Sequence, residues 1–469
     1  MNSFRDRWQA LRSRQVMGLT IINIILAATA FGKDVAFAVY FGTTAYADAL
    51  TLAFFIPDAI GNNLLAWAIG VACVPVFSAL YTRGEFERLR YCFRKVMLHM
   101  LAGSAAICLC LYLFKRELLR LLVPGFEQYA FELCLALFAL LLPTLLLFPI
   151  VMIASALLQA MKSFYAPAWA PVAFNGIFLL AVAFLAGSGI SLATGSYVVA
   201  VFLLIGVLAM TGVVLLPFYR DGSKLGLLSV RKSGRVGGNE AGLKQIYRRF
   251  VPYLLILLGT QAVYVLERSL ASSLDEGTIA ALTYAFRLSQ FPNWVFISAI
   301  TTVLLPVMSK ALAEQKHHEL RTVVAQAIKT ALLITVPLSA FLYAAREPVI
   351  SLLFVHGSFD EHSLAVTADI FAGYALTIVT QSLSAICLRY YLAVGKMRVP
   401  LAVYAVSMLA NAALDYWLVS RIGAAGLGYG AACGAALNAA LLIICLLQDL
   451  KNREKGVAHE SFSDYHPLI

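Results

Sequence analysis

Long apolar runs, separated by short polar breaks, dominate this sequence. A helix needs about 20 apolar residues to cross a bilayer. The runs show no strand-like alternation, so helices are the expected spanning elements. We expect an all-α polytopic membrane protein of about twelve transmembrane helices. The expected spans lie near 16–41, 48–81, 97–114, 128–161, 165–187, 191–218, 250–274, 278–309, 322–344, 363–388, 399–419 and 424–448.

Composition excludes a soluble fold. Of the 469 residues, 61% are hydrophobic and 13% are charged, whereas soluble domains carry about 25% charged residues. The net charge of +11 does not indicate a nucleic-acid partner, because the basic residues occupy alternate loops and form no single face of a soluble domain.

The distribution of basic residues predicts the orientation. Of the 36 Lys and Arg, about 27 fall in the segments that this scheme places in the cytoplasm, as the positive-inside rule requires. Arg5, Arg7, Arg12 and Arg14 resemble the start of a signal peptide, but the following run is too long and has no A-x-A-like exit. We therefore expect a bacterial inner-membrane protein with a retained first span and both termini in the cytoplasm.

The two halves of the sequence resemble each other. Residues 121–127 are similar in sequence to residues 353–360, and Pro75 corresponds to Pro306, at separations of about 231 to 233 residues. A steady offset predicts a parallel six-plus-six repeat, because an even number of spans returns the chain to the same side. Two six-helix lobes around a central cavity are the expected architecture.

The expected boundaries follow from this repeat. Residues 1–218 form the N-terminal lobe, 219–249 a basic cytoplasmic linker, 250–448 the C-terminal lobe and 449–469 a cytoplasmic tail. We expect the linker's basic residues mainly to keep this segment in the cytoplasm. The alternative is that they contact anionic lipid headgroups.

Polar residues inside the first two spans mark a candidate site. They are Lys33, Asp34, Asp48, Asp58, Asn62 and Asn63. A charge near the bilayer centre is costly, so such groups normally face a protein interior or a wet cavity. Pro57 among them predicts a bent or unwound helix. Alternatively, Lys33 and Asp34 form an ion pair at the membrane interface, with the lysine side chain extended toward the headgroups.

The second half has its own polar set: Glu267, Arg268, Arg287, Gln290, Asp369, Asn411 and Asp415. Arg287 has no acid at i±3 or i±4, so if buried it requires a partner on another helix or an anionic substrate. Asn411 and Asp415 are spaced i, i+4 and share a helix face. With Glu267 they are candidate ligands for a monovalent cation. An interhelical hydrogen bond for this pair, and an interfacial place for Glu267, are the plainer alternatives.

The motifs of enzymes are missing from the sequence. It has no phosphate-cradling glycine loop, no H-E-x-x-H and no nucleophile elbow. A transporter without an organic cofactor is expected, with energy from Na⁺ or H⁺ coupling, the membrane potential or substrate supply. The eight cysteines show no metal-ligand spacing beside histidine and are expected to be core residues.

Several segments together resemble the MurJ/MviN family of lipid II flippases, part of the multidrug/oligosaccharidyl-lipid/polysaccharide exporter superfamily. The resemblance covers nearly the whole chain in order. It rests on Phe41-Gly42-Thr43 with Ala47-Asp48-Ala49, Phe54-Phe55-Ile56-Pro57, Val74-Pro75-Val76, Phe164-Tyr165-Ala166-Pro167-Ala168, Pro171, Asn175, Ala271-Ser272, Gly277, Tyr284-Ala285, Arg287-Leu288, Phe291-Pro292, Leu304-Leu305-Pro306 and Ser309.

The resemblance implies a carrier that moves a polyprenyl-diphosphate-linked glycan across the cytoplasmic membrane by alternating access. Lys33, Asp48 and Arg287 fall where the family has cavity arginine, aspartate and arginine. Basic groups suit the anionic head of such a substrate. With Asn62 and Gln290 they form the expected substrate-binding set. Glu267, Asn411 and Asp415 resemble the family's cation site.

The sequence also departs from the family pattern. Ala27 and Gly61 stand where the family has further cavity arginines, and Ala66 and Gln290 where it has acids. The chain stops after the expected twelfth helix, where family members usually have two more. The departures leave three functions open. The chain could be a flippase, whose substrate is lipid II or another lipid-linked saccharide such as an exopolysaccharide repeat unit. It could also be an ion-coupled exporter of amphiphiles or drugs, or a non-transporting scaffold of an envelope-synthesis complex. Membrane lipids and envelope enzymes are the expected partners of a monomeric chain.

Overall fold

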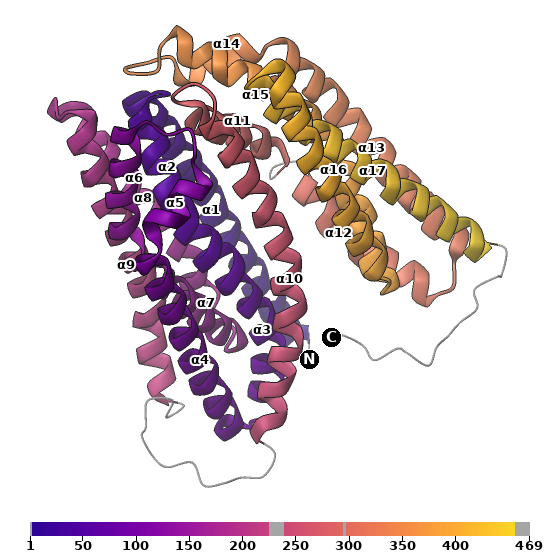
Figure 1. Ribbon diagram of the computed structural model, residues 1–469. Helices are drawn as coiled ribbons and strands as arrows, with labels where there is room; N and C mark the ends of the chain where they lie inside the picture. The colour runs from indigo at the N-terminus through magenta and orange to yellow at the C-terminus, as the bar shows by residue number, and fades with distance from the viewer. Residues whose placement is uncertain (1, 225–238, 294–296, 455–469) are drawn as a thin grey trace. The chain divides into compact units, whose positions relative to one another are not determined.

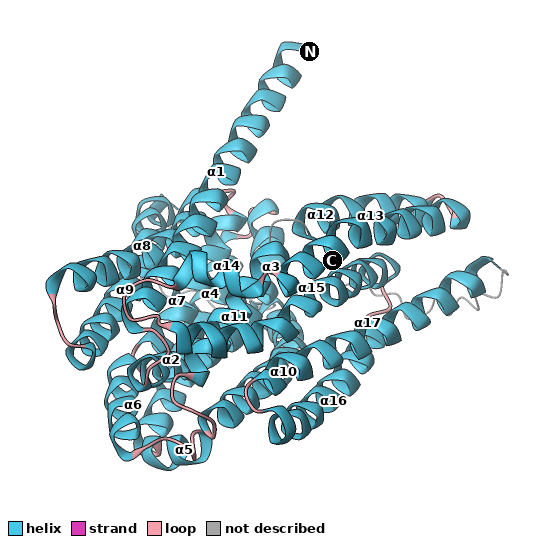
Figure 2. Ribbon diagram, turned by 90° about the horizontal axis from the view of Figure 1, so that it is seen from above, coloured by secondary structure: helices cyan, strands magenta, loops and turns pink. Residues whose placement is uncertain are grey.

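The computed structural model describes residues 2–224, 239–293 and 297–454 (Figure 1). These residues are almost entirely helical, and no β-strand occurs among them (Figure 2). The all-α fold expected from the continuous apolar runs is therefore confirmed.

The chain divides into two compact units. The first contains the residues up to Gln261 except the tripeptides 42–44 and 123–125, which belong to the second unit with the residues from Ala262 onward. The predicted basic linker, 219–249, is helical at both ends, and residues 225–238 lie outside the described part of the chain.

The first unit contains nine α-helices, a π-helix and the larger part of α10 among its described residues. They are α1 (Asn2–Phe41), α2 (Ala45–Pro57), the π-helix η1 (Asp58–Ala66), α3 (Trp67–Thr82), α4 (Phe86–Leu113), α5 (Lys115–Leu122), α6 (Gln128–Leu141), α7 (Thr144–Ala160), α8 (Tyr165–Ser188), α9 (Leu192–Lys224) and α10 (Asn239–Ser272).

The second unit continues from the end of α10. Its helices are α11 (Thr278–Pro292), α12 (Ser298–Ala313), α13 (His317–Ala344), α14 (Arg346–Phe354), α15 (Glu361–Val394), α16 (Arg398–Ile422) and α17 (Ala425–Glu454). Helices α15, α16 and α17 pack side by side (Figure 1).

Eleven helical stretches in the described residues are long and apolar enough to cross a membrane. One predicted span, 278–309, includes residues 294–296, which the structure does not describe, and α11 and α12 lie on either side of them. The helical content agrees with the predicted polytopic membrane fold.

Helix boundaries follow the predicted repeat. Helices α4 and α13 begin 231 positions apart, at Phe86 and His317, and end 231 positions apart, at Leu113 and Ala344. Helices α8 and α16 begin at Tyr165 and Arg398, which are 233 positions apart. The duplication read from a few sequence landmarks therefore holds for whole helices.

Some elements were not expected from hydropathy. Short helices α5 and α14 occupy equivalent positions after α4 and α13. The predicted span 128–161 is interrupted at Pro143, between α6 and α7. The irregularity expected at Pro57 takes the form of η1, in agreement with the inability of proline to donate a backbone hydrogen bond. Such π-helical turns often occur at functional positions.

Close helix packing in the second unit depends on glycine. A Cβ on Gly373 of α15 would lie 2.0 Å from the carbonyl carbon of Gly428 of α17. Backbones therefore meet directly at this crossing, as small residues permit in membrane proteins. Elsewhere in the second unit, Met308, Leu320 and Tyr390 belong to a cluster of buried apolar side chains that pack together.

Candidate functional site

Four polar side chains of the second unit form one cluster, which we call the acidic cluster: the buried Glu267 of α10, Tyr374 of α15 and Asp415 of α16, and the partly buried Asn411 of α16. The Tyr374 hydroxyl donates to Glu267 Oε2 at 3.5 Å, and Asn411 Nδ2 donates to Asp415 Oδ2 at 3.2 Å. Asn411 also lies near the Glu267 carboxylate. The structure thus brings together the three residues of the predicted cation site, from helices far apart in sequence.

The acidic cluster is shielded from solvent. Glu267 is 4% exposed and Asp415 is 0% exposed. Oδ1 of Asn411 and Oδ1 of Asp415 are buried and accept no hydrogen bond within the described part of the chain. Leaving a buried acceptor unmatched costs about 1–3 kcal/mol. These two oxygens are therefore available to a ligand that donates or carries positive charge.

Glycines of α17 make the room for these oxygens. A Cβ on Gly430 would lie 1.9 Å from Asp415 Oδ1, and a Cβ on Gly434 would lie 2.5 Å from Asn411 Oδ1. Two carboxylates and an amide oxygen suit a hard cation such as Na⁺, or a proton that neutralises one acid. Among the described residues, no three His, Cys, Asp or Glu side chains come together as a metal site.

Lys33, on α1 of the first unit, pairs with its sequence neighbour. Its Nζ lies 2.6 Å from Asp34 Oδ1, and the two side chains are only 12% and 20% exposed. Its ammonium also lies 5.5 Å from the ring centroid of Phe178 on α8. The positive charge is thus held against an acid and an aromatic ring, in a partly buried setting.

Asp48 and Asn62 lie on the bent second span of the first unit. Asp48 is 4% exposed and stands in the first turn of α2, where the helix dipole favours an acid. Asn62 lies in η1, where its Nδ2 donates to Asp58 Oδ1 at 3.1 Å. Asn63 Nδ2 donates to the other oxygen of Asp58, also at 3.1 Å. The π-helix therefore gathers one carboxylate and two amides.

Arg287 and Gln290 lie on α11 of the second unit. Arg287 is exposed, whereas Gln290 is partly buried. Gln290 Nε2 donates to Gln381 Oε1 at 3.3 Å, and Asn293 Nδ2 donates to the same oxygen at 2.6 Å. Gln381 in turn donates to Thr377 Oγ1 at 3.3 Å. Gln290 therefore belongs to an amide network between α11 and α15.

Tyr374 and Gln381 were not expected from the sequence to be site residues. Tyr374 gave no signal, because tyrosine is common in apolar helices. Thr377 and Gln381 are spaced i, i+4, so the rule that singled out Asn411 and Asp415 would also have found this pair. The predicted substrate-binding residues are distributed over both units: Lys33, Asp48 and Asn62 in the first, Arg287 and Gln290 in the second.

Comparisons with known proteins give a consistent result. The family model described as "Lipid II flippase MurJ" matches residues 37–463. The lipid II flippase MurJ of Burkholderia cenocepacia is 25% identical over 449 residues, with 95% of this chain and 84% of the relative covered. A probable lipid II flippase MurJ of Treponema pallidum is 24% identical, covering 90% of this chain and 80% of that protein.

Solved structures show the same fold. A lipid II flippase MurJ in an inward closed conformation matches with a TM-score of 0.76 at 20% identity, covering 96% of this chain and 94% of that one. An inward-facing multidrug resistance MATE transporter of the MOP superfamily matches with a TM-score of 0.79 at 17% identity, covering 92% and 96%.

Proposed function

Because the chain belongs to the lipid II flippase MurJ family, we propose that it moves lipid II across the bacterial inner membrane. The match over residues 37–463 carries this proposal, since it extends through both units. It favours lipid II over the exopolysaccharide, amphiphile-export and scaffold alternatives. The likeness to MATE transporters concerns the fold alone.

The proposed substrate contacts follow from the chemistry of a lipid-linked diphosphate. Arg287 is the exposed cation, and its guanidinium suits bidentate contact with phosphate oxygens. Lys33 is held by Asp34 at 2.6 Å, so it would exchange this acid for a phosphate when the substrate arrives. Asp48, Asn62 and Gln290 are the proposed hydrogen-bond partners of the polar head.

The acidic cluster is the proposed coupling site. Of the two buried carboxylates, Glu267 has the Arg268 guanidinium nearby, so the second negative charge, on Asp415, requires neutralisation in the low-dielectric interior. The unmatched oxygens of Asn411 and Asp415 support binding of Na⁺ or a proton there. A gradient of that ion, or the membrane potential, would then drive transport.

The proposed orientation places both termini in the cytoplasm. The support comes from the distribution of lysine and arginine, of which about 27 of 36 lie in alternate segments. Lipid II would then enter from the leaflet that faces these basic segments.

Complementation tests the flippase proposal. Cells depleted of their own lipid II flippase would express this chain, and outer-leaflet lipid II would be measured with an added hydrolase that does not cross the membrane. We expect rescue by the wild-type chain and at least a tenfold lower flipping rate for Arg287→Ala, which corresponds to about 1.4 kcal/mol. Lys310→Ala, at a side chain that is 77% exposed, is the matched control.

Two results would contradict these assignments. A correctly inserted wild-type chain that leaves lipid II in the inner leaflet would reject lipid II as substrate. Full flipping by Arg287→Ala would remove Arg287 from the substrate contacts. For the coupling site, vesicles with an imposed Na⁺ or pH gradient should show gradient-dependent flipping that Asp415→Asn abolishes, and an unchanged dependence would reject it.

A further inference from the structure

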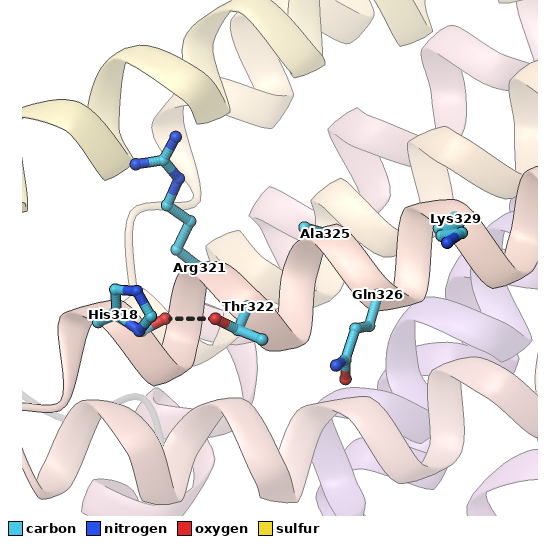
Figure 3. Close-up of a pocket in the computed structure, with 6 residues that line it drawn as sticks. All are labelled: His318, Arg321, Thr322, Ala325, Gln326 and Lys329. Carbon is cyan, nitrogen blue, oxygen red and sulfur yellow. Dashed lines mark hydrogen bonds between the residues drawn. The ribbon is translucent and has the colours of Figure 1, made fainter.

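Helices α4 and α13, which correspond to the third predicted span of each half, each carry a shallow surface hollow near the N-terminal end. On α13 the hollow is lined by His318, Arg321, Thr322, Ala325, Gln326 and Lys329 (Figure 3). On α4 it is lined by Glu87, Arg90, Tyr91, Arg94, Lys95 and Leu98. Each lining position on α4 has its counterpart on α13 exactly one repeat later, at an offset of 231. The two hollows are therefore repeat-related features of the fold.

The lining on α4 contains three basic side chains and one acid, Glu87, and the lining on α13 contains two basic side chains and a histidine but no acid. Arg90 and Arg321 occupy the same repeat position. Arg94 and Lys95 add positive charge on α4, as does Lys329 on α13. Each set follows i, i+3, i+4, i+7, i+8 and i+11, so it forms one helix face. We call these two faces the basic stripes.

An exposed apolar surface continues along the same helices. On α4, Leu98 and Leu109 are each 59% exposed. On α13, Leu333 is 73% and Phe341 is 59% exposed. In a membrane protein such side chains contact lipid chains. A lipid that covers this surface would bring its headgroup to the basic stripe.

The opposite ends of α4 and α13 also match each other. Lys115 lies 4.3 Å from the ring centroid of Tyr112, and Arg346 lies 5.5 Å from that of Tyr343. Aromatic residues with cations are typical of membrane interfaces. Arg90 precedes Tyr112, and Arg321 precedes Tyr343, by 22 positions, which is about 33 Å of helix. This is close to the hydrocarbon thickness of about 30 Å. Arg90 and Arg321 thus lie at the headgroup level of one leaflet. Lys95 and Lys329 lie about 8 and 12 Å further along their helices, and their long side chains extend back toward the same headgroups.

We propose that each basic stripe binds the phosphate headgroup of one anionic phospholipid, whose acyl chains lie along the exposed face of α4 or α13. Charge complementarity selects an anionic over a zwitterionic lipid. Topogenic lysines and arginines act through their number within a loop, and they have no need for one helix face or for the repeat position that Arg90 and Arg321 share. The proposal is independent of which substrate the protein transports.

Lipid binding to the purified full-length chain tests the proposal. Bound lipids would be counted by native mass spectrometry during titration with phosphatidylglycerol, and with phosphatidylcholine of the same acyl chains. The test variants are Arg94→Gln with Lys95→Gln on α4, and Arg321→Gln with Lys329→Gln on α13. Each should lose one tightly bound phosphatidylglycerol, with affinity about 30-fold lower, which corresponds to about 2 kcal/mol.

The matched controls remove the same charge near the same membrane face but outside the stripes. They are Arg83→Gln with Arg88→Gln, and Lys310→Gln with Lys316→Gln, which should keep both lipids. Equal losses in test and control variants, or equal binding of phosphatidylcholine, would overturn the proposal. If a double variant does not fold, Lys95→Gln and Lys329→Gln alone should each weaken binding about fivefold, and unchanged affinity would reject the site.

Discussion

Substituting Gly430 by alanine tests whether glycine makes the room for the Asp415 carboxylate. The added Cβ would lie 1.9 Å from Asp415 Oδ1, whereas an ordinary contact begins near 3.4 Å. The carboxylate or helix α17 must therefore move by about 1.5 Å. Overpacking of this kind costs about 1–3 kcal/mol. Alanine's better helix propensity offsets up to about 1 kcal/mol of that.

A double-mutant cycle isolates the contact. The next neighbours of the added Cβ are Asp415 Cγ at 3.0 Å and Cα at 3.1 Å. Asp415→Ala removes Oδ1 and Cγ, so it should relieve most of the clash. We expect Gly430→Ala to destabilise the chain by about 1–2 kcal/mol alone, and by at least about 1 kcal/mol less when Asp415 is already alanine.

Unfolding of the purified protein in detergent micelles, followed by circular dichroism against denaturant, measures all four variants. Gly212→Ala is the control, because a Cβ there would meet nothing within 4 Å, and it should be neutral or slightly stabilising. Additivity of Gly430→Ala and Asp415→Ala within about 0.5 kcal/mol would refute the argument, since the two residues would then not be in contact.

Two further substitutions test local contacts. The Asp360 side chain accepts a hydrogen bond from the Ser363 N–H at 2.8 Å, and hydrogen bonds from Ser363 hold the pKa of Asp360 below its usual value. Asp360→Ala should therefore cost about 1 kcal/mol at neutral pH. This difference should vanish as the pH falls through the lowered pKa, because the group stabilises the fold only when ionised. Unfolding measured against pH checks this, and a pH-independent difference would contradict it. Asp58→Ala leaves the Asn62 and Asn63 amides without their acceptor and should cost about 1–3 kcal/mol, whereas Asp58→Asn should cost less; equal thermal stability of both variants would count against this.

Hydropathy and spacing determined the helical fold and its duplication. The length of an apolar run determines whether a segment can span a bilayer. Corresponding residues such as Pro75 and Pro306 predicted the repeat, which the boundaries of α4 and α13 confirm. Spacing also placed Asn411 and Asp415 on one helix face, because helix periodicity is a local property.

Only the tertiary structure decided which polar groups meet. Glu267 of α10 meets the Tyr374 hydroxyl of α15, and Gly430 leaves room for Asp415 because α17 packs on α16. Lys33 is held by Asp34 and Phe178, and Gln290 joins Gln381. Helix rotation and crossing in a membrane depend on side-chain packing, because lipid-facing and protein-facing surfaces are equally apolar. Hydropathy therefore finds the spans but leaves their contacts undetermined.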